Sequence, residues 1–246
     1  MKRLCFIIAL IGAVVLFAPF SHAKDVYTVR IQGAINPAVA GFLGECIEKA
    51  GKADAEALVV LLDTPGGLDS SMRDIVKEIM DAPVPVIVYV APSGARAASA
   101  GAIILLASHV AAMAPGTNAG AAHPVSIGKE KTDEVMMKKV VSDAEAYSKS
   151  IAARRGRNVD FAAKAVTESI SITARDALAQ KVIDVVADST DDLLVQMDGR
   201  TVETRKGKVV LRTKGAKKTE IAMPFKFRFL AYVSDPNVAY ILMMIG

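Results

Sequence analysis

The sequence predicts an α/β domain built on a mainly parallel sheet. Short apolar runs rich in β-branched residues alternate with longer segments of helical periodicity along most of the 246 residues. The runs at residues 57–62 and 84–90 carry no charged side chain, which is typical of strands buried on both faces. The segments between successive runs are long enough to return the chain as helices, so that the strands lie parallel.

The first 23 residues have the features of an export signal. Lys2 and Arg3 precede an uncharged apolar stretch from residue 4 to 20, and small residues at positions 21 and 23 provide a cleavage site. The alternative is an uncleaved membrane anchor, for which this stretch is at the short end of the required length. We expect residues 1–23 to be a signal peptide, and the protein to be exported and membrane-associated on the periplasmic, extracytoplasmic side of the inner membrane.

The first half of the remaining chain is expected to contain four strands and three helices. Asn36 followed by Pro37 is an N-cap with proline at the first helical position, which opens a helix. A Pro-Gly-Gly turn ends the second strand, and small residues after the third strand lead into another helix. The expected strands are residues 26–31, 57–62, 84–90 and 110–113, and the expected helices are residues 37–52, 70–81 and 98–107.

The second half continues the same alternation as far as residue 188. Thr173 with Asp176 three residues later forms a capping box, which opens a helix before the last strand. Residues 24–188 are therefore predicted to form one domain. The other expected elements are a Gly- and Ala-rich loop at 115–128, helices at 133–155 and 159–166, and a strand at 182–186.

The character of the sequence changes after Asp188. Residues 200–218 are strongly basic, and turn signals divide them into short pieces of β character. We expect a small basic β-rich appendage at 189–233, which could attract lipid phosphates or an acidic partner, although a solvated hairpin is an equal alternative. Residues 234–246 form an apolar tail that is too short to cross a bilayer and could pack on the domain, lie at a membrane surface or begin a membrane segment.

Two loops that follow predicted strands carry residues suited to acyl-transfer chemistry. Parallel sheets bind ligands at the carboxyl ends of their strands. The loop DTPGG at 63–67 has a glycine pair whose amides can approach a phosphate or an oxyanion, although such a pair alone is usually a turn. The loop GARAASAG at 94–101 places Ser99 among very small residues near a helix start. By spacing alone a serine there is more often a helix cap than a nucleophile.

A nucleophilic serine needs a base, and the sequence offers several. His109 begins a buried strand and is predicted to be structural, whereas His123 lies in the loop after it. Helical periodicity places Lys139 on a face with Val135, Ser142 and Ala146, and we expect this face to turn inward. A lysine acts as a base only where burial lowers its pKa. Cys46 lies among apolar helical positions and is predicted to be a core residue. The candidates for the base are His109, His123, Lys138 and Lys139.

Four segments, taken together and in order, resemble the NfeD family. They are LLDTPGG, SGARAASAGAIILLASHVAAMAPGTNAGAAHPV, VVSDAEAY and ITARDALAQKVIDVVA. Members of this family are ClpP-class, membrane-associated serine proteases, usually encoded beside a stomatin-like protein. The resemblance covers residues 26–186, and the tail DPNVAYILMMIG resembles the point where longer members enter the membrane.

The resemblance implies a ClpP/crotonase-like fold and a serine–lysine dyad. It implies that Ser99 is the nucleophile and Lys139 the general base. The backbone amides of Gly67 and Ala100 would form the oxyanion hole. The implied substrate is an apolar-rich peptide segment, for example of a stomatin-like membrane partner, and the implied assembly is a homo-oligomer, for which the apolar face of the helix at 133–155 is a candidate surface.

Other interpretations remain open at the level of sequence. In the wider ClpP group a Ser-His-Asp triad places its histidine where His123 stands, but Ser169 occupies the aspartate position, next to Glu168. A histidine without its orienting carboxylate is a weaker base. A non-catalytic membrane scaffold and an acyl-CoA enzyme are the alternatives of other classes. The sequence shows no metal-ligand spacing and no cofactor motif, and the net charge of +4 gives no argument for nucleic acid.

Overall fold

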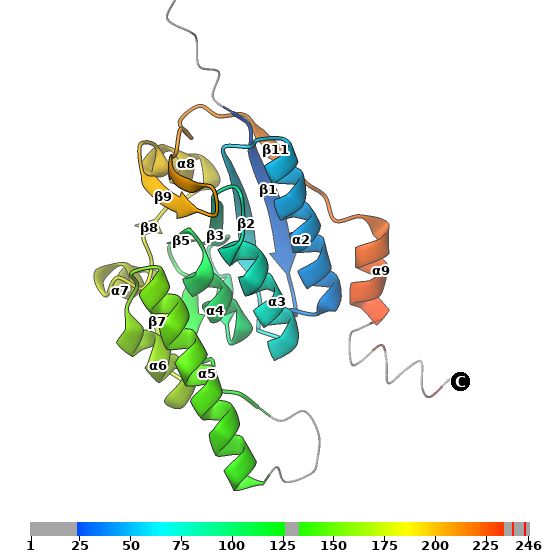
Figure 1. Ribbon diagram of the computed structural model, residues 1–246, viewed down its shortest axis with the longest axis vertical. Helices are drawn as coiled ribbons and strands as arrows, with labels where there is room; N and C mark the ends of the chain where they lie inside the picture. The colour runs from blue at the N-terminus through cyan, green and yellow to red at the C-terminus, as the bar shows by residue number, and fades with distance from the viewer. Residues whose placement is uncertain (1–23, 126–132, 234–237, 239–243, 245–246) are drawn as a thin grey trace, which may run out of the picture.

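The computed structural model describes residues 24–125, 133–233, 238 and 244, and its centre is a six-stranded sheet (Figure 1). The strand order is β11-β1-β2-β3-β5-β8, and every neighbouring pair is parallel. The predicted α/β class with a mainly parallel sheet is therefore confirmed. The strands are β1 (Val26–Gln32), β2 (Ala57–Asp63), β3 (Val86–Val90), β5 (Val110–Met113), β8 (Val185–Val186) and β11 (Lys218–Glu220).

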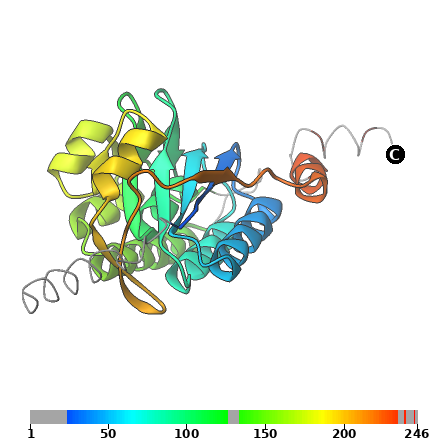
Figure 2. The ribbon, with the colours of Figure 1, turned by 90° about the horizontal axis from the view of Figure 1, so that it is seen from above.

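Helices cover both faces of this sheet, which explains why its central strands are apolar throughout. Along β2, Leu58 and Val60 face the larger core while Ala57 and Val59 face the smaller one. The larger core is completed by α2 (Pro37–Lys52), α3 (Asp69–Met80), α4 (Ala100–Ala107), α5 (Glu134–Arg154) and α6 (Val159–Thr167). The smaller core is completed by α8 (Thr190–Met197), and Figure 2 shows the sheet between these two layers.

The helix starts follow the capping signals in the sequence. The Asn36 side chain accepts a hydrogen bond of 3.0 Å from the Val39 amide, and Pro37 is the first residue of α2. Thr173 accepts from the Asp176 amide at 3.3 Å and donates to the Asp176 carboxylate at 2.7 Å, so the capping box opens α7 (Ala174–Ala179). Both predicted helix starts are confirmed.

A second, three-stranded sheet lies beside the carboxyl edge of the main sheet. Its strands are β4 (Arg96–Ala98), β6 (Asn118–Gly120) and β7 (Ser171–Thr173). β4 runs parallel to β6, and β6 runs antiparallel to β7. The sequence pattern predicted only a loop around β6, because Asn-Ala-Gly has no strand propensity and pairing alone holds it extended.

The C-terminal segment 189–233 is less β-rich than predicted and shares the cores of the main domain. It contains the hairpin β9 (Thr201–Thr204) and β10 (Gly207–Val210), but also α8 and α9 (Phe225–Val233). Leu211 and Ile221 are buried, and β11 extends the main sheet beside β1. Regular apolar spacing was too sparse here to indicate this packing.

Two predictions fall wholly or mostly outside the described residues. The signal peptide at 1–23 is one, and the apolar tail at 234–246 is the other except for Val238 and Met244. Within the described ranges, no helix is long and apolar enough to span a bilayer.

Candidate functional site

The two loops that sequence analysis singled out lie side by side. The Thr64 amide donates to the Arg96 carbonyl at 2.8 Å, and the Ala98 amide donates back to the Thr64 carbonyl at 3.1 Å. The Asp63 carboxylate also accepts from the Arg96 amide at 3.2 Å. These bonds join the DTPGG loop to β4, the strand that leads into Ser99. The expectation that both loops follow neighbouring strand ends is confirmed.

Ser99 occupies a strained turn between β4 and α4. Its backbone angles are φ 53° and ψ −120°, a region that L-residues with a side chain rarely adopt. Its amide donates to the Gly120 carbonyl at 2.9 Å, which ties the turn to β6. Although Ser99 stands at the N-cap position of α4, its side chain makes no capping hydrogen bond. The hydroxyl therefore remains available, as in the strand-to-helix turns that expose nucleophilic serines.

Glycines make room for this turn. A Cβ on Gly66 would lie 2.6 Å from the Cβ of Ser99 and 3.1 Å from its Oγ, and Gly66 has a φ of 115°. A Cβ on Gly67 would overlap the Ile35 carbonyl, and a Cβ on Gly101 would lie 2.5 Å from the Thr64 side chain. The approach of the DTPGG loop to Ser99 thus depends on missing side chains.

Two backbone amides near Ser99 have unused hydrogen-bonding capacity. Ala100 is the first residue of α4, and its amide has no partner within the helix. Neither this amide nor that of Gly67 donates to an acceptor among the described residues. Free amides at a helix N-terminus favour negative charge because the helix dipole is positive there. This pair is the one that the family resemblance implies for an oxyanion hole.

Ser99 lies where two adjoining cavities meet. One has a volume of about 650 Å³ and extends along Ile35, Val39 and Leu68 toward α9. The other, of about 270 Å³, extends toward Val140 and Ala144 of α5. Gly67, Leu68, Ser99, His123 and Val125 line both. The walls are mostly apolar, so the combined space suits an apolar chain that passes over the serine.

His123 lies at the same cavities as Ser99. Its Nδ1 is 2.8 Å from the Val166 carbonyl oxygen, so this nitrogen carries the proton and donates. In the neutral form of the ring, Nε2 would then keep its lone pair. The carbonyl thus orients the ring in place of a carboxylate, and the exposed Ser169 and Glu168 take no part in a hydrogen bond to it. Sequence analysis could not identify this acceptor because every residue has a carbonyl.

Lys139, unlike His123, does not line either cavity at Ser99. Both Lys138 and Lys139 are exposed on α5, whereas Val140, directly after Lys139, lines the smaller cavity. The expectation that the face of Lys139 turns inward is wrong. The buried face of α5 is formed by residues offset from that face, which are Ala144, Ser148, Ile151 and Ala152. The periodicity misled because α5 carries few strongly apolar residues with which to mark its inner side.

The remaining candidates are structural. Cys46 is buried in the core, and burial raises the pKa of its thiol to about 12, which makes it a poor nucleophile. His109 is buried at the start of β5, and its Nδ1 accepts from the Val86 amide at 3.1 Å. Burial, together with the charges of Arg155 and Arg157, lowers the pKa of His109 to about 3. Both predictions of a core role are confirmed.

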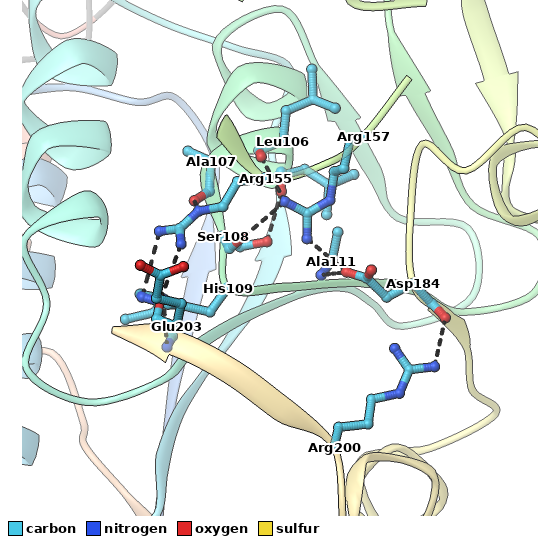
Figure 3. Close-up of polar contacts among 12 residues, drawn as sticks. Leu106, Ala107, Ser108, His109, Ala111, Arg155, Arg157, Asp184, Arg200 and Glu203 are labelled. Carbon is cyan, nitrogen blue, oxygen red and sulfur yellow. Dashed lines mark hydrogen bonds and ion pairs between the residues drawn. The ribbon is translucent and has the colours of Figure 1, made fainter. Parts of the chain in front are cut away.

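The opposite end of α4 is held by two arginines (Figure 3). Arg157 donates to the Leu106 carbonyl at 2.7 Å and to the Ser108 carbonyl at 2.8 Å, and Arg155 donates to the Ala107 carbonyl at 2.8 Å. Arg157 also pairs with Asp184 at 2.6 Å, and its side chain is only 3% exposed. These cations satisfy the last carbonyls of α4 and oppose its negative end.

Comparison with known proteins places this arrangement in a family. Residues 25–223 match the family described as "NfeD1b, N-terminal domain". The chain is 36% identical over 250 residues to "Membrane-bound protease PH1510" of Pyrococcus horikoshii, a match that covers all of this chain and 56% of the relative. It is 33% identical over 117 residues to "Membrane protein NfeD1b" of Bacillus subtilis, covering 48% of this chain and 26% of the relative. The chain thus spans about half or less of the lengths of these relatives.

Solved structures agree with the sequence matches. A lysine-to-alanine mutant of "1510-N membrane-bound stomatin-specific protease", in complex with a substrate peptide, matches with a TM-score of 0.80 at 34% identity, covering 88% of this chain and all of the other. A serine-to-alanine mutant of the same protease matches with a TM-score of 0.75 at 35% identity, covering 81% of this chain and 98% of the other. The expected ClpP-like fold is therefore confirmed, and the chain belongs to the NfeD family.

Proposed function

We propose that the protein is a serine endopeptidase whose nucleophile is Ser99. The observation that carries this proposal is the strained N-cap position of Ser99, whose hydroxyl makes no capping hydrogen bond and lies beside two backbone amides that have no acceptor among the described residues. Relatives at 34–36% identity are named as proteases, and a serine mutant and a lysine mutant of one of them have been solved. We propose a peptide substrate because these relatives are named as proteases and the cavities at Ser99 have mostly apolar walls.

The chemistry would proceed by acyl transfer. A base takes the proton of Ser99 Oγ, and Oγ bonds to the peptide carbonyl carbon while the amides of Gly67 and Ala100 receive the oxyanion. The carbon–nitrogen bond then breaks, and the protonated base gives its proton to the leaving amine. Water, activated by the same base, then attacks the ester carbonyl of the acyl-enzyme. The ester bond breaks, the carboxylic acid is released, and the base returns the proton to Ser99 Oγ.

We assign the base to Lys139, in a Ser-Lys dyad. The solved relatives named as a serine mutant and a lysine mutant support a pair of these residue types. In the structure Lys139 is exposed, but its neighbour Val140 borders the smaller cavity. A peptide that fills this cavity would exclude water from that turn of α5, and exclusion of water favours the neutral, proton-accepting form of a lysine.

A second candidate base is His123. The hydrogen bond from its Nδ1 to the Val166 carbonyl supports this alternative, since it fixes the tautomer with Nε2 free to accept a proton. His123 shares both cavities with Ser99, and Lys139 lines neither. A non-catalytic membrane scaffold is the alternative in which neither residue acts, and it predicts no hydrolysis at all.

The proposed substrate is an apolar-rich segment of a stomatin-like membrane protein. One relative is named as a protease specific for a stomatin homologue, and the cavity walls Ile35, Val39 and Leu68 suit apolar side chains. We further propose that the protein is exported, acts at the periplasmic face of the inner membrane and self-associates. The features that support this are the sequence of residues 1–23 and the names of membrane-bound relatives.

The test is cleavage of apolar peptides by the full chain and four single variants. We expect Ser99→Ala and Lys139→Ala each to lower the cleavage rate by about 10⁴-fold or more. The serine and the lysine would act as one unit, so the loss of either side chain removes most of the rate enhancement. Lys138→Ala is the matched control, since it removes a neighbouring exposed lysine, and it should cleave like the parent. Full activity in Ser99→Ala would contradict the proposal.

The fourth variant, His123→Gln, separates the two bases. With Lys139 as base, His123→Gln retains most of the cleavage rate and Lys139→Ala loses it. With His123 as base, His123→Gln abolishes cleavage while Lys139→Ala does not.

A further inference from the structure

Helix α9 is fixed to the domain by one side only. The ring of Phe227 is buried against α2, where it lies 5.7 Å from the Phe42 ring and covers Gly41. A Cβ on Gly41 would lie 3.2 Å from the Phe227 ring, so the close approach of the two helices requires glycine. Lys226 adds an ion pair to Glu45 of α2 at 2.5 Å. In Figures 1 and 2, α9 lies at the side of the molecule, next to α2.

The other side of α9 is an exposed aromatic stripe. Phe225, Phe229 and Tyr232 follow one another at intervals of four and three residues, so they project from one face of the helix. They are 74%, 55% and 66% exposed, and the rings of Phe225 and Phe229 stack at 6.1 Å. Soluble proteins seldom expose several large aromatic side chains side by side to water.

The charged residues of α9 itself are both basic. They are Lys226, which pairs with Glu45 of α2, and Arg228, and the helix contains no carboxylate. The sequence beyond Val238 continues with the uncharged residues 239–246. Aromatic rings flanked by basic side chains suit the headgroup region of an anionic bilayer, where rings enter the boundary and cations meet phosphates.

The same helix borders the cavity at Ser99. Ala231 of α9 and Met223 just before it line the 650 Å³ cavity together with Pro65 and Leu68. Ala231 is next in sequence to Tyr232 of the stripe, so α9 contributes both to the cavity wall and to the exposed aromatic surface. A surface that covers the stripe would therefore lie near the cavity.

We infer that the stripe Phe225, Phe229 and Tyr232 lies in the surface of an anionic bilayer and holds the mouth of the Ser99 cavity against that surface. A second consequence rests on the proposed peptidase function. The site then takes peptide segments that lie at the bilayer surface, because a substrate held there is present at high effective concentration beside α9.

The chain contains no Trp, so a single introduced Trp reports on this contact alone. Phe229→Trp in the full chain is mixed with vesicles of equal parts phosphatidylcholine and phosphatidylglycerol. Trp emission should move to shorter wavelength, and phosphatidylcholine brominated near the headgroup end of its acyl chains should quench it. Val195→Trp is the matched control, because Val195 is a similarly exposed apolar residue on α8 and should show neither effect.

This readout is independent of whether other apolar segments bind the vesicles. If the protein floats with vesicles while Trp at 229 stays unquenched, the inference is wrong. It is also wrong if the emission shift appears without vesicles and grows with protein concentration, since a second copy would then cover the stripe. Equal quenching at 195 and 229 would mean nonspecific adsorption and would contradict it as well.

A second experiment compares the rates at which the protein cleaves one apolar peptide in two forms. In one form the peptide is free in solution, and in the other it is tethered to the same vesicles by a lipid chain. The parent should cleave the tethered peptide about tenfold faster or more. Arg228→Glu, which places a carboxylate beside the stripe, should lose this advantage and keep its rate on the free peptide. If Ser99→Ala cleaves like the parent while Trp at 229 is quenched, the peptidase mechanism fails and the surface contact stands.

Discussion

The two ends of α4 are built in opposite ways. At the C-terminal end, Arg155 and Arg157 satisfy the carbonyls of Leu106, Ala107 and Ser108 (Figure 3). At the N-terminal end, Ser99 offers no cap, and the Ala100 amide has no acceptor among the described residues. An ordinary helix start would place a hydrogen bond there, as Ser189 does for α8 by accepting from the Asp192 amide at 3.1 Å.

The difference shows where the fold supplies stability and where it supplies chemistry. At the satisfied end, Arg155 and Arg157 join the last carbonyls of α4 to the chain just after α5, and Arg157 pairs with Asp184 just before β8. The open end keeps two amide donors and one hydroxyl in place without using them. Preorganised donors of this kind stabilise an oxyanion without reorganising during the reaction. The first two predictions below each change one end and leave the other intact, and the next two concern residues near the satisfied end.

The largest expected loss of stability follows from removing the buried cation of the satisfied end. Arg157→Met leaves the carbonyls of Leu106 and Ser108 without this donor and removes the cation from Asp184, whose carboxylate keeps its hydrogen bond from the Ala111 amide. We expect the free energy of unfolding to fall by about 3 kcal/mol. Urea denaturation of parent and variant measures it. Adding Asp184→Asn to Arg157→Met should recover part of the loss, and a change below about 1 kcal/mol in the single variant would contradict the assignment.

At the open end, a methyl group should be enough to disturb the serine. Gly66→Ala places a Cβ against Ser99, and we expect peptide hydrolysis to fall by about a hundredfold because the nucleophile is displaced. Gly199→Ala is the matched control: Gly199 also has a positive φ, of 78°, but a Cβ there meets no atom within 4 Å. It should cost about 1 kcal/mol of stability and no activity. Equal activity in the two variants would show that Gly66 does not position the serine.

The histidine beside the arginines makes stability depend on pH. His109 has a folded pKa of about 3, so the unfolded chain binds a proton between pH 6.5 and 3 that the folded protein excludes. Its contribution is fully present above pH 6.5 and is lost on acidification at about 1.4 kcal/mol per pH unit. His109→Asn keeps a side-chain acceptor for the Val86 amide and should lack this part of the slope. Parallel pH profiles for parent and variant would refute the effect.

The smallest effect is expected at Arg154, three residues before the buried Arg157. Arg154 meets Glu203 at 3.8 Å with both side chains well exposed. Solvent screens such a pair, so Arg154→Ala should change the free energy of unfolding by no more than about 0.5 kcal/mol. Urea denaturation again provides the measurement. A loss as large as that of Arg157→Met would mean that burial does not distinguish the two arginines.

The sequence predicted the fold well because strands buried on both faces and capped helices leave strong local patterns. Asn36 and Thr173 cap their helices as expected, and the strand around Val59 is where its apolar run placed it. Sequence patterns failed to predict the structure where strand pairing or side-chain packing determines it. β6 is held by its neighbours, and the inner face of α5 is marked by Ala144 and Ser148, whose side chains are small.

The same limit applies to the site. The small residues around Ser99 indicated a tight turn, and the structure realises it as a strained N-cap. The role of Gly66 depends on a contact across two loops, and the orientation of His123 depends on the Val166 carbonyl. A carbonyl acceptor leaves no mark on residue type, and a glycine at position 66 does not by itself show which residue it approaches. The packing of α9 beside the cavity was missed for the same reason.

The most direct test of the account compares the two serines at helix starts. Ser99→Ala should lower the rate of peptide hydrolysis by about 10⁴-fold or more and leave the free energy of unfolding unchanged, because its hydroxyl caps nothing. Ser189→Ala should lose about 1 kcal/mol of stability and keep the parent rate. Hydrolysis at the parent rate by Ser99→Ala would contradict the central claim that the open end of α4 carries the chemistry.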